Sequence, residues 1–310
     1  MRFAKKVFDK DKIYVYRWQN KTFTQLGVIK ETWSQDNIYV SVGDMDNNGR
    51  AEIYVTNLGE SDVSSLVYEW NGNAFKKIAS GQRWFFRVID IPGQGRSLIG
   101  QRRETGGEFF GDVLFLNREG DRFVPAGPLK LPPFSNIYNF TFANLEGRGE
   151  PRIVMLDHED RLRLYNQGDK EEIWRSDEAY GGSYSLIETG DIHGKMNYTF
   201  IALPLYITDV DEDGQNEVMV GKNHSQIGRF IERARLFSSG TLHFLTWDKV
   251  GLSPKWISKK QPGPIVGYRV IDVDNDGHKE LIIASVTKRA ILLRKFTGKP
   301  RSQVVVYDLK

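Results

Sequence analysis

Three short segments of the chain repeat the same arrangement of acidic residues. They are GDMDNNGRAEI (43–53), TDVDEDGQNEV (208–218) and IDVDNDGHKEL (271–281). Each has carboxylate or amide side chains at loop positions 1, 3, 5 and 9, and glycine at position 6, where the backbone must turn sharply. Side chains brought together by such a turn offer only oxygen ligands, which is the chemistry that a hard cation such as Ca²⁺ requires.

Electrostatic repulsion within each loop also favours a bound dication. In the loop 272–280 four carboxylates converge: Asp272, Asp274, Asp276 and Glu280. Two unit charges about 4 Å apart repel by about 4 kcal/mol at an effective dielectric of about 20, and every pair in the loop contributes. One acidic turn is most simply a solvated surface turn, but three copies in register, each followed by an apolar strand, favour metal sites. An EF-hand is excluded because its last acidic ligand stands at position 12, between helices.

Two further segments keep the place of these loops in the chain but lose most of the acidic residues at the ligand positions. They are DIPGQGRSL (90–98) and NLEGRGEPR (144–152). In the first, proline, glutamine and leucine stand at ligand positions. In the second, Arg148 and Arg152 stand at positions 5 and 9 and face Glu146, so that a guanidinium takes the place of a cation. We expect neither segment to bind metal.

The elements that position these loops follow from the sequence between them. The five loops begin at residues 44, 90, 144, 209 and 272, with spacings of 46, 54, 65 and 63 residues. Between them, alternating apolar and polar residues flank short polar turns, which is the pattern of antiparallel hairpins. The hairpins cover 12–26, 66–78, 113–126, 162–174 and 242–257. Each repeat thus contains a strand, a loop, a second strand and a hairpin.

Four strands in a repeat of this length predict an all-β fold, a single β-propeller domain over residues 1–310 built from four-stranded antiparallel blades. Five repeats are visible, and an N-terminal partial blade (1–30) adds to them. We therefore expect six blades, with five and seven as the alternatives. We also expect the C-terminal strand 304–309 to pair with the N-terminal piece and close the ring, because closure removes free sheet edges.

Two features depart from the repeat. The segment 223–240 is an insertion, within which 227–237 is the best helix candidate. Irregular additions to a regular scaffold often carry function, so we expect this insertion to contact a partner. Some aromatic side chains suit contacts with sugars or proteins, although packing between blades is their favoured role. These are Trp84, Phe85, Phe86, Phe109, Phe110 and Tyr180.

The acidic loops and their spacing resemble those of FG-GAP/VCBS repeat proteins, which are related in plan to the calcium-binding propeller of integrin α chains and include uncharacterised bacterial proteins. The resemblance covers nearly the whole chain and implies three structural Ca²⁺ sites. The implied side-chain ligands are Asp44, Asp46, Asn48, Glu52, Asp209, Asp211, Asp213, Glu217, Asp272, Asp274, Asp276 and Glu280. The implied backbone-carbonyl ligands are Arg50, Gln215 and His278. We expect the first loop to bind most weakly, because Asn48 replaces an acid and Arg50 lies nearby.

The amino-acid composition excludes several classes of function. Apolar residues make up 40 % of the chain and charged residues 27 %, which supports a packed core. The absence of cysteine excludes disulfides, thiolate metal sites and cysteine nucleophiles. The formal charge is +3 without a basic run, so neither nucleic-acid binding nor membrane insertion is expected. Calcium loops of this kind suit extracellular calcium, so we expect an extracellular, cell-surface or periplasmic protein whose export signal lay upstream of Met1.

The sequence holds no motif for catalysis or for an organic cofactor. Its five histidines are scattered, and HExxH, G-x-S-x-G and phosphate-binding loops do not occur. We therefore expect the protein not to be an enzyme, but a calcium-stabilised scaffold for adhesion and for protein or glycan interaction. Two alternatives stay open: a polysaccharide-acting lyase or glycosidase, and a structural subunit of a larger surface assembly.

Overall fold

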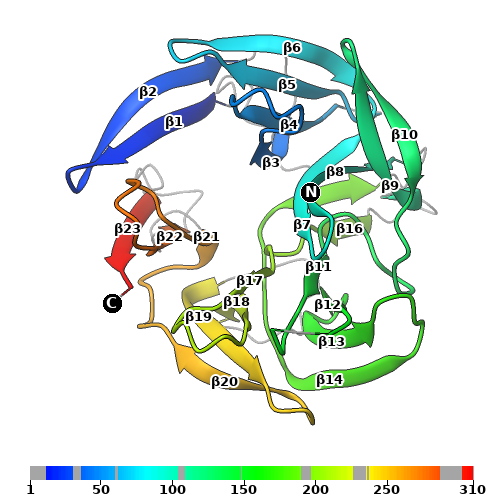
Figure 1. Ribbon diagram of the computed structural model, residues 1–310, viewed down its shortest axis with the longest axis vertical. Coiled ribbons are helices and arrows are strands. Elements are labelled where there is room, and N and C mark those ends of the chain that lie inside the picture. Colours follow the sequence, from blue (N-terminus) through cyan, green and yellow to red (C-terminus); the bar gives the residue numbers. More distant parts are fainter. Residues whose placement is uncertain are drawn as a thin grey trace. The chain divides into compact units, whose positions relative to one another are not determined.

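The computed structural model describes most of the chain. The described residues are 12–30, 36–59, 62–103, 109–147, 149–189, 197–225, 235, 237–286 and 302–309. Within these ranges every helix or strand that the structure contains is a β-strand (Figure 1), which confirms the all-β prediction. The described residues hold no helix that is long and apolar enough to span a membrane.

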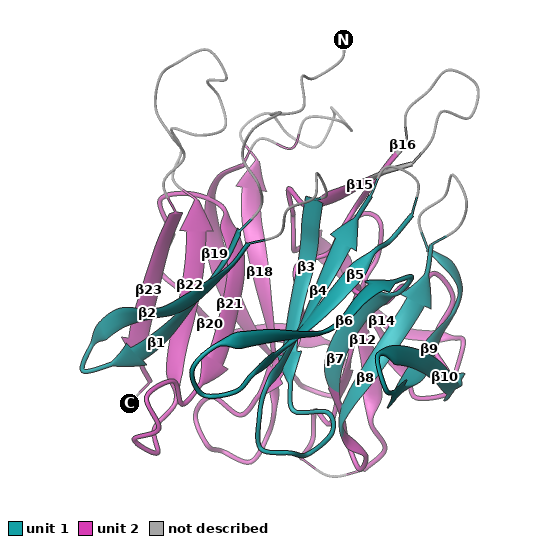
Figure 2. Cartoon of the chain, turned by 90° about the horizontal axis from the view of Figure 1, so that it is seen from above, with its two compact units in different colours: residues 1–89, 96–128 teal, residues 90–95, 129–310 magenta. Residues whose placement is uncertain are grey.

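The chain folds as two compact units, which Figure 2 shows in different colours. Unit 1 consists of residues 1–89 and 96–128, and unit 2 of residues 90–95 and 129–310. The strands up to residue 128 are β1 (Lys12–Gln19), β2 (Thr22–Lys30), β3 (Asp36–Gly43), β4 (Glu52–Leu58), β5 (Ser65–Trp70), β6 (Phe75–Gln82), β7 (Phe85–Ile91), β8 (Gly95–Arg102), β9 (Phe110–Glu119) and β10 (Arg122–Pro128).

Thirteen further strands follow along the chain. They are β11 (Phe140–Ala143), β12 (Arg152–Leu156), β13 (Arg161–Asn166), β14 (Glu172–Ala179), β15 (Leu186–Thr189), β16 (Asn197–Phe200), β17 (Tyr206–Thr208), β18 (Glu217–Ser225), β19 (Phe237–Trp247), β20 (Leu252–Ile257), β21 (Ile265–Ile271), β22 (Glu280–Val286) and β23 (Ser302–Asp308).

The strands form sheets in which each strand pairs with its neighbours in the sequence. Four sheets have four strands each: β3 to β6, β7 to β10, β11 to β14 and β17 to β20. A fifth sheet, β21 to β23, has three, and the hairpins β1–β2 and β15–β16 form two-stranded sheets. Antiparallel four-stranded sheets in sequence order are the blades of a β-propeller, so the described strands supply five sheets of blade form.

The strands at the two ends of the chain each pair within their own unit. The C-terminal strand β23, which contains most of 304–309, pairs antiparallel with β22 over its whole length. The N-terminal strands β1 and β2 pair with each other. Pairing of the C-terminal strand with the N-terminal piece would join the two units and stays a prediction.

Strand β18 of unit 2 is buried on both faces. From β18, Val218 and Val220 pack into one apolar cluster with β12 and β13 residues such as Val154 and Leu164. Met219, which points the opposite way, packs into a second cluster that includes Leu281 of β22. Middle strands of stacked sheets need apolar side chains on both faces, which explains why EVMV is continuously apolar after its first residue.

The insertion 223–240 belongs to a long hairpin. Its first residues end β18 and its last residues begin β19, while most of 227–237, the predicted helix, lies outside the described residues. Of the aromatic candidates, Trp84, Phe85, Phe86 and Tyr180 are buried in the core, as the packing interpretation predicts. Phe110 is 57 % exposed.

Candidate metal centre

The three acidic loops join the first and second strands of their blades in the same register. Residues Gly43 and Glu52 pair across β3 and β4, and Thr208 and Glu217 pair across β17 and β18. Ile271 pairs with Glu280 across β21 and β22 in the same way. The glutamate at position 9 is thus the first residue of the second strand, at the base of the loop. All three glutamates are buried.

The backbone of each loop makes the same turn. Position 6 is glycine with a positive φ, 81° at Gly49, 85° at Gly214 and 92° at Gly277. Position 4 also has a positive φ, at Asn47, Glu212 and Asn275. Two left-handed residues in so short a segment curl the chain around the carboxylates, and glycine adopts that conformation at the lowest cost.

A repeated set of hydrogen bonds fixes the acidic side chains. In loop 272–280, Asp272 accepts the N–H of Asp276 on Oδ1 (3.1 Å) and the N–H of Gly277 on Oδ2 (3.0 Å). Asp276 Oδ1 accepts the N–H of His278 at 2.8 Å, and Glu280 Oε2 accepts the N–H of Val273 at 2.9 Å. One oxygen on each of positions 5 and 9, together with the carboxylate at position 3, remains for another ligand.

Loop 272–280 contains a buried oxygen without a partner. Asp272, Asp274 and Asp276 each place an oxygen within 4.8 Å of the others. Asp274 Oδ1 is buried and accepts no hydrogen bond from the described residues. A carboxylate oxygen without a donor costs free energy on burial, and a cation among the three carboxylates would remove that cost.

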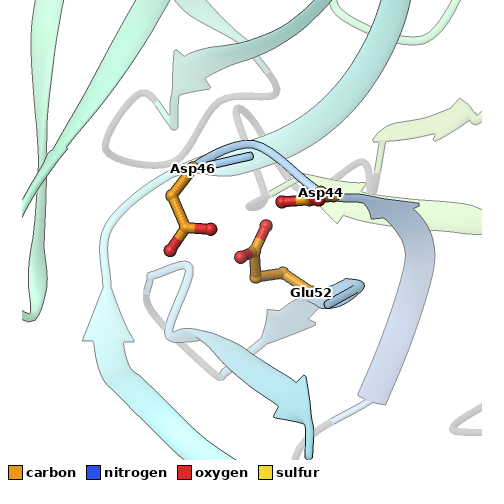
Figure 3. A group of neighbouring side chains, drawn as sticks. All are labelled: Asp44, Asp46 and Glu52. Atoms are coloured by element: carbon orange, nitrogen blue, oxygen red, sulfur yellow. The ribbon is translucent and has the colours of Figure 1, made fainter. Parts of the chain in front are cut away.

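Loop 44–52 also contains a buried oxygen without a partner, at its glutamate. Asp44, Asp46 and Glu52 turn their carboxylates toward one another (Figure 3), with an oxygen of each within 4.8 Å of the others. Glu52 Oε2 accepts the N–H of Met45 at 2.8 Å, but the buried Oε1 has no partner among the described residues. Burial, and then the charges of Asp46 and Asp44, raise the pKa of Glu52 above its usual value.

The side chains of Asn48 and Arg50 in this loop both contact Glu69. Asn48 uses Oδ1 to accept the N–H of Arg50 and donates from Nδ2 to Glu69 Oε2 at 2.9 Å. Arg50 Nη1 lies 3.5 Å from Glu69 Oε1. The arginine is therefore drawn away from the carboxylates by Glu69, although Arg118 Nη1 lies 3.5 Å from Asp46 Oδ2.

Loop 209–217 already holds a cation, the ammonium of Lys255. Its Nζ lies 2.7 Å from Asp211 Oδ2, 2.7 Å from Asp213 Oδ2 and 3.1 Å from Glu217 Oε1. These are the oxygens that the backbone leaves unused in each loop. The carboxylates raise the pKa of Lys255 above its usual value, with the hydrogen bond to Asp211 as the largest cause, so the ammonium stays charged.

The structure explains how Lys255 reaches this position. On β20, Pro254 pairs with Leu245 and Trp256 pairs with Phe244, which leaves Lys255 as the extra residue of a β-bulge. Bulges re-aim side chains relative to the regular alternation of a strand. Sequence reasoning missed Lys255, because no local motif marks a residue that enters the loop from another strand.

The two eroded loops keep the turn but lack most of the carboxylates at the ligand positions. In 144–152, Gly147 and Gly149 have positive φ at positions 4 and 6, as Gly93 and Gly95 do in 90–98. Arg152 Nη2 lies 3.2 Å from Glu146 Oε1, so the predicted pairing is present. Arg148 lies outside the described residues.

A pocket of about 310 Å³ lies in unit 2 beside loop 209–217. Its polar lining comes from β17, β21 and the ends of two acidic loops: Tyr206, Thr208, Asp209, Asn216, Arg269 and Lys279. The guanidinium of Arg269 lies over the ring of Tyr206, 4.2 Å from its centroid. Asn216 Nδ2 donates to the carbonyl of Asn144 at 2.7 Å, which ties the pocket wall to the eroded loop 144–152.

No protein-family model and no curated protein matches the chain. Among solved structures it is similar to a fructofuranosidase from Schwanniomyces occidentalis complexed with fructose, at 8 % identity and a TM-score of 0.46. It is also similar to an exotype rhamnogalacturonan lyase, at 14 % identity and a TM-score of 0.34. The matches cover 89 % and 86 % of this chain, which spans 62 % and 55 % of theirs.

These comparisons correct one expectation. The chain was expected not to be an enzyme, yet the solved structures to which it is similar include enzymes. That expectation is therefore withdrawn. With TM-scores below 0.5, the likenesses carry no activity, substrate or site residue over to this chain.

Proposed function

We propose that this chain is a calcium-binding β-propeller of the FG-GAP/VCBS kind that works outside the cytoplasm as a scaffold for glycan or protein ligands. One observation carries the calcium proposal: the buried oxygens Glu52 Oε1 and Asp274 Oδ1 lack a hydrogen-bond donor, and each belongs to a convergent group of carboxylates. Buried carboxylate oxygens are normally satisfied, and a hard dication is the partner that suits several of them at once.

The proposal is for two calcium sites and not three. Loops 44–52 and 272–280 would hold Ca²⁺ through their carboxylates, whereas the ammonium of Lys255 already lies among three carboxylates of loop 209–217. The expected order of affinity changes accordingly, with loop 209–217 weakest. When bound, the ion supplies positive charge that ties together the two strands on either side of each loop.

A role outside the cytoplasm fits this set of ligands. Each proposed site combines a few carboxylates with backbone groups on a short exposed loop, which suits dissociation constants of about 10⁻⁴–10⁻³ M, as in extracellular calcium modules. At ten times that dissociation constant, calcium stabilises the folded state by about 1.4 kcal/mol per site. Six blades, with the N-terminal hairpin β1–β2 as part of the sixth, remain part of this proposal.

The test is calcium content and a thermal melt of the intact chain in 2 mM Ca²⁺ and in excess EGTA. Two bound calcium ions per chain and a Tm rise of a few degrees are expected. No bound calcium together with identical Tm values would overturn the calcium proposal. Mg²⁺ at equal concentration serves as the control, because its strict octahedral geometry suits these irregular loops less well.

A polysaccharide-acting enzyme is the second candidate. The observation on this chain that favours it is the pocket beside loop 209–217, where a carboxylate, a guanidinium, an ammonium and a phenol line one cavity. Such a set offers groups that accept and donate protons near a bound sugar. Incubation with neutral and acidic polysaccharides, followed by reducing-end and unsaturated-product assays, tests this candidate. If every polysaccharide stays uncleaved, the enzyme candidate is rejected.

A further inference from the structure

The pocket beside loop 209–217 carries more positive than negative charge. Arg269 and Lys279 contribute two cations and Asp209 contributes one anion, which gives the lining a net charge of +1. A volume of about 310 Å³ lies at the lower end of the range for small-molecule pockets, which begins at about 300 Å³. The site thus suits a small monoanion or one anionic unit of a polymer.

Arg269 is held in place with its donors available to a ligand. Its guanidinium lies on the face of Tyr206, and its side chain is 42 % exposed. Asp90 Oδ2 forms an ion pair with Nη2 at 3.8 Å, a separation that is beyond hydrogen-bond distance. Stacking on an aromatic ring fixes the plane of a guanidinium and leaves its edge to bind a planar carboxylate through two parallel hydrogen bonds.

Two of the remaining polar groups, Asp209 and Asn216, offer acceptors for hydroxyl groups. Asp209 accepts the N–H groups of Asp213 at 3.1 Å and of Gly214 at 2.9 Å, which fixes the carboxylate, and each oxygen has a further lone pair. Asn216 donates through Nδ2 to Asn144, which leaves its Oδ1 as an acceptor. A phosphate dianion in this pocket would lie near the charge of Asp209, whereas a ligand that combines hydroxyl groups with one carboxylate meets both kinds of group.

We propose that this pocket binds a hydroxylated monocarboxylate, with a uronic-acid residue of an acidic polysaccharide as its polymeric form. The carboxylate lies against Arg269 and Lys279, and the sugar hydroxyls donate to Asp209 and Asn216. This inference rests on the proposed function as a glycan-binding scaffold and names its ligand class. It does not rest on calcium, because Lys255 holds loop 209–217 in place without a metal.

The test is calorimetric binding of trigalacturonate and of galactotriose, its neutral counterpart, to the intact chain. Measurements are made in Ca²⁺ and in EGTA, because calcium bound to acidic loops would also attract a uronate. Trigalacturonate is expected to bind at least about tenfold more tightly than galactotriose in both buffers, since hydrogen bonds to charged groups are worth more than about 1.4 kcal/mol.

The variant Arg269→Gln is expected to weaken trigalacturonate binding at least about tenfold and to leave galactotriose binding nearly unchanged. Lys249→Gln, which removes an exposed cation from the β19–β20 turn, serves as the matched control for net charge. Equal affinity for the two sugars, or an equal effect of the two variants, would overturn the inference. Binding in Ca²⁺ alone would assign the uronate to bound calcium and would also overturn it. The calcium proposal is judged separately by the melt.

Discussion

Lys255 Nζ and Glu217 Oε1 lie 3.1 Å apart at the point where a metal ion would sit in loop 209–217. The glutamate is completely buried, while the lysine comes from the bulge in β20. Its ammonium also contacts Asp211 and Asp213 at 2.7 Å each. One loop of the repeat thus holds a covalently attached cation against three of its carboxylates.

Replacement of Lys255 by methionine should open this loop to calcium. Methionine keeps most of the length of the side chain but removes its charge, so three carboxylates lose their cation. We expect Lys255→Met to bind one more calcium ion per chain than the unmodified protein, measured by metal analysis after equilibrium dialysis. In EGTA its Tm should fall by a few degrees, because the buried carboxylate of Glu217 loses its ammonium partner.

The matched control for this change is Lys249→Met, on the same hairpin but exposed at the turn. It should change neither the calcium content nor the Tm. If Lys255→Met binds no more calcium than Lys249→Met, the carboxylates of loop 209–217 do not form a cation site even when empty.

Neutralising Asp274 should have opposite effects with and without calcium. In EGTA, Asp274→Asn relieves repulsion from Asp272 and Asp276, so the Tm should stay equal or rise. In saturating calcium the variant should lose one ion and about 1.4 kcal/mol of stabilisation at ten times the dissociation constant. Thermal melts in both buffers, with calcium content measured in parallel, check the prediction. A Tm that falls equally in both buffers would show that Asp274 acts only through packing.

Glu52→Gln should likewise lose a calcium ion from loop 44–52 in saturating calcium and stabilise the fold in EGTA. The raised pKa of Glu52 gives an additional reason: it means that ionisation of this side chain disfavours the folded state, and glutamine does not ionise. Without calcium, the folded state binds the proton more tightly than the unfolded state, so this group's contribution to stability falls as pH rises through the raised pKa. We expect Glu52→Gln to flatten that fall in melts between pH 4 and pH 7 in EGTA. An unchanged pH dependence would contradict this account.

The repeat allowed the blades to be predicted from the sequence, but it did not predict that Lys255 enters loop 209–217. Aspartates two residues apart, a glycine and an apolar run are local features, so the sequence predicts both the turn and the strand that begins with Glu217. The approach of Lys255 depends instead on the register of β19 and β20 and on a bulge, which pairwise alternation does not reveal. Asn48 likewise turns to Glu69, a partner 21 residues away.

His243 should make unit 2 less stable in mild acid. Burial, followed by the charge of Lys222, lowers its pKa from 6.5 to about 4, although Glu178 opposes the shift. The neutral imidazole therefore stabilises the folded state fully above pH 6.5, and this contribution is lost as the pH falls from 6.5 to about 4. The loss amounts to about 3 kcal/mol at most.

The variant His243→Phe keeps an aromatic ring against Tyr180 and removes the titration. We expect its free energy of unfolding, measured by urea denaturation, to change less between pH 7 and pH 4 than that of the unmodified chain. The exposed His158 gives the matched control, His158→Phe, which should keep the original pH dependence. Parallel pH profiles for all three proteins would show that burial of His243 does not contribute.

Alanine substitutions at Gly147 and Gly149 would distinguish the free-energy cost of a left-handed backbone from that of a steric clash. Both have a positive φ in the eroded loop 144–152. A Cβ at Gly147 would overlap the carbonyl oxygen of Gly214, whereas a Cβ at Gly149 would meet no atom within 4 Å. Gly149→Ala should therefore cost about 1–2 kcal/mol for the left-handed conformation alone. Gly147→Ala should cost a further 1–3 kcal/mol or so, because the adjoining loop 209–217 must shift. Urea denaturation of the two variants measures the difference, and equal losses would mean that the two loops do not pack against each other in solution.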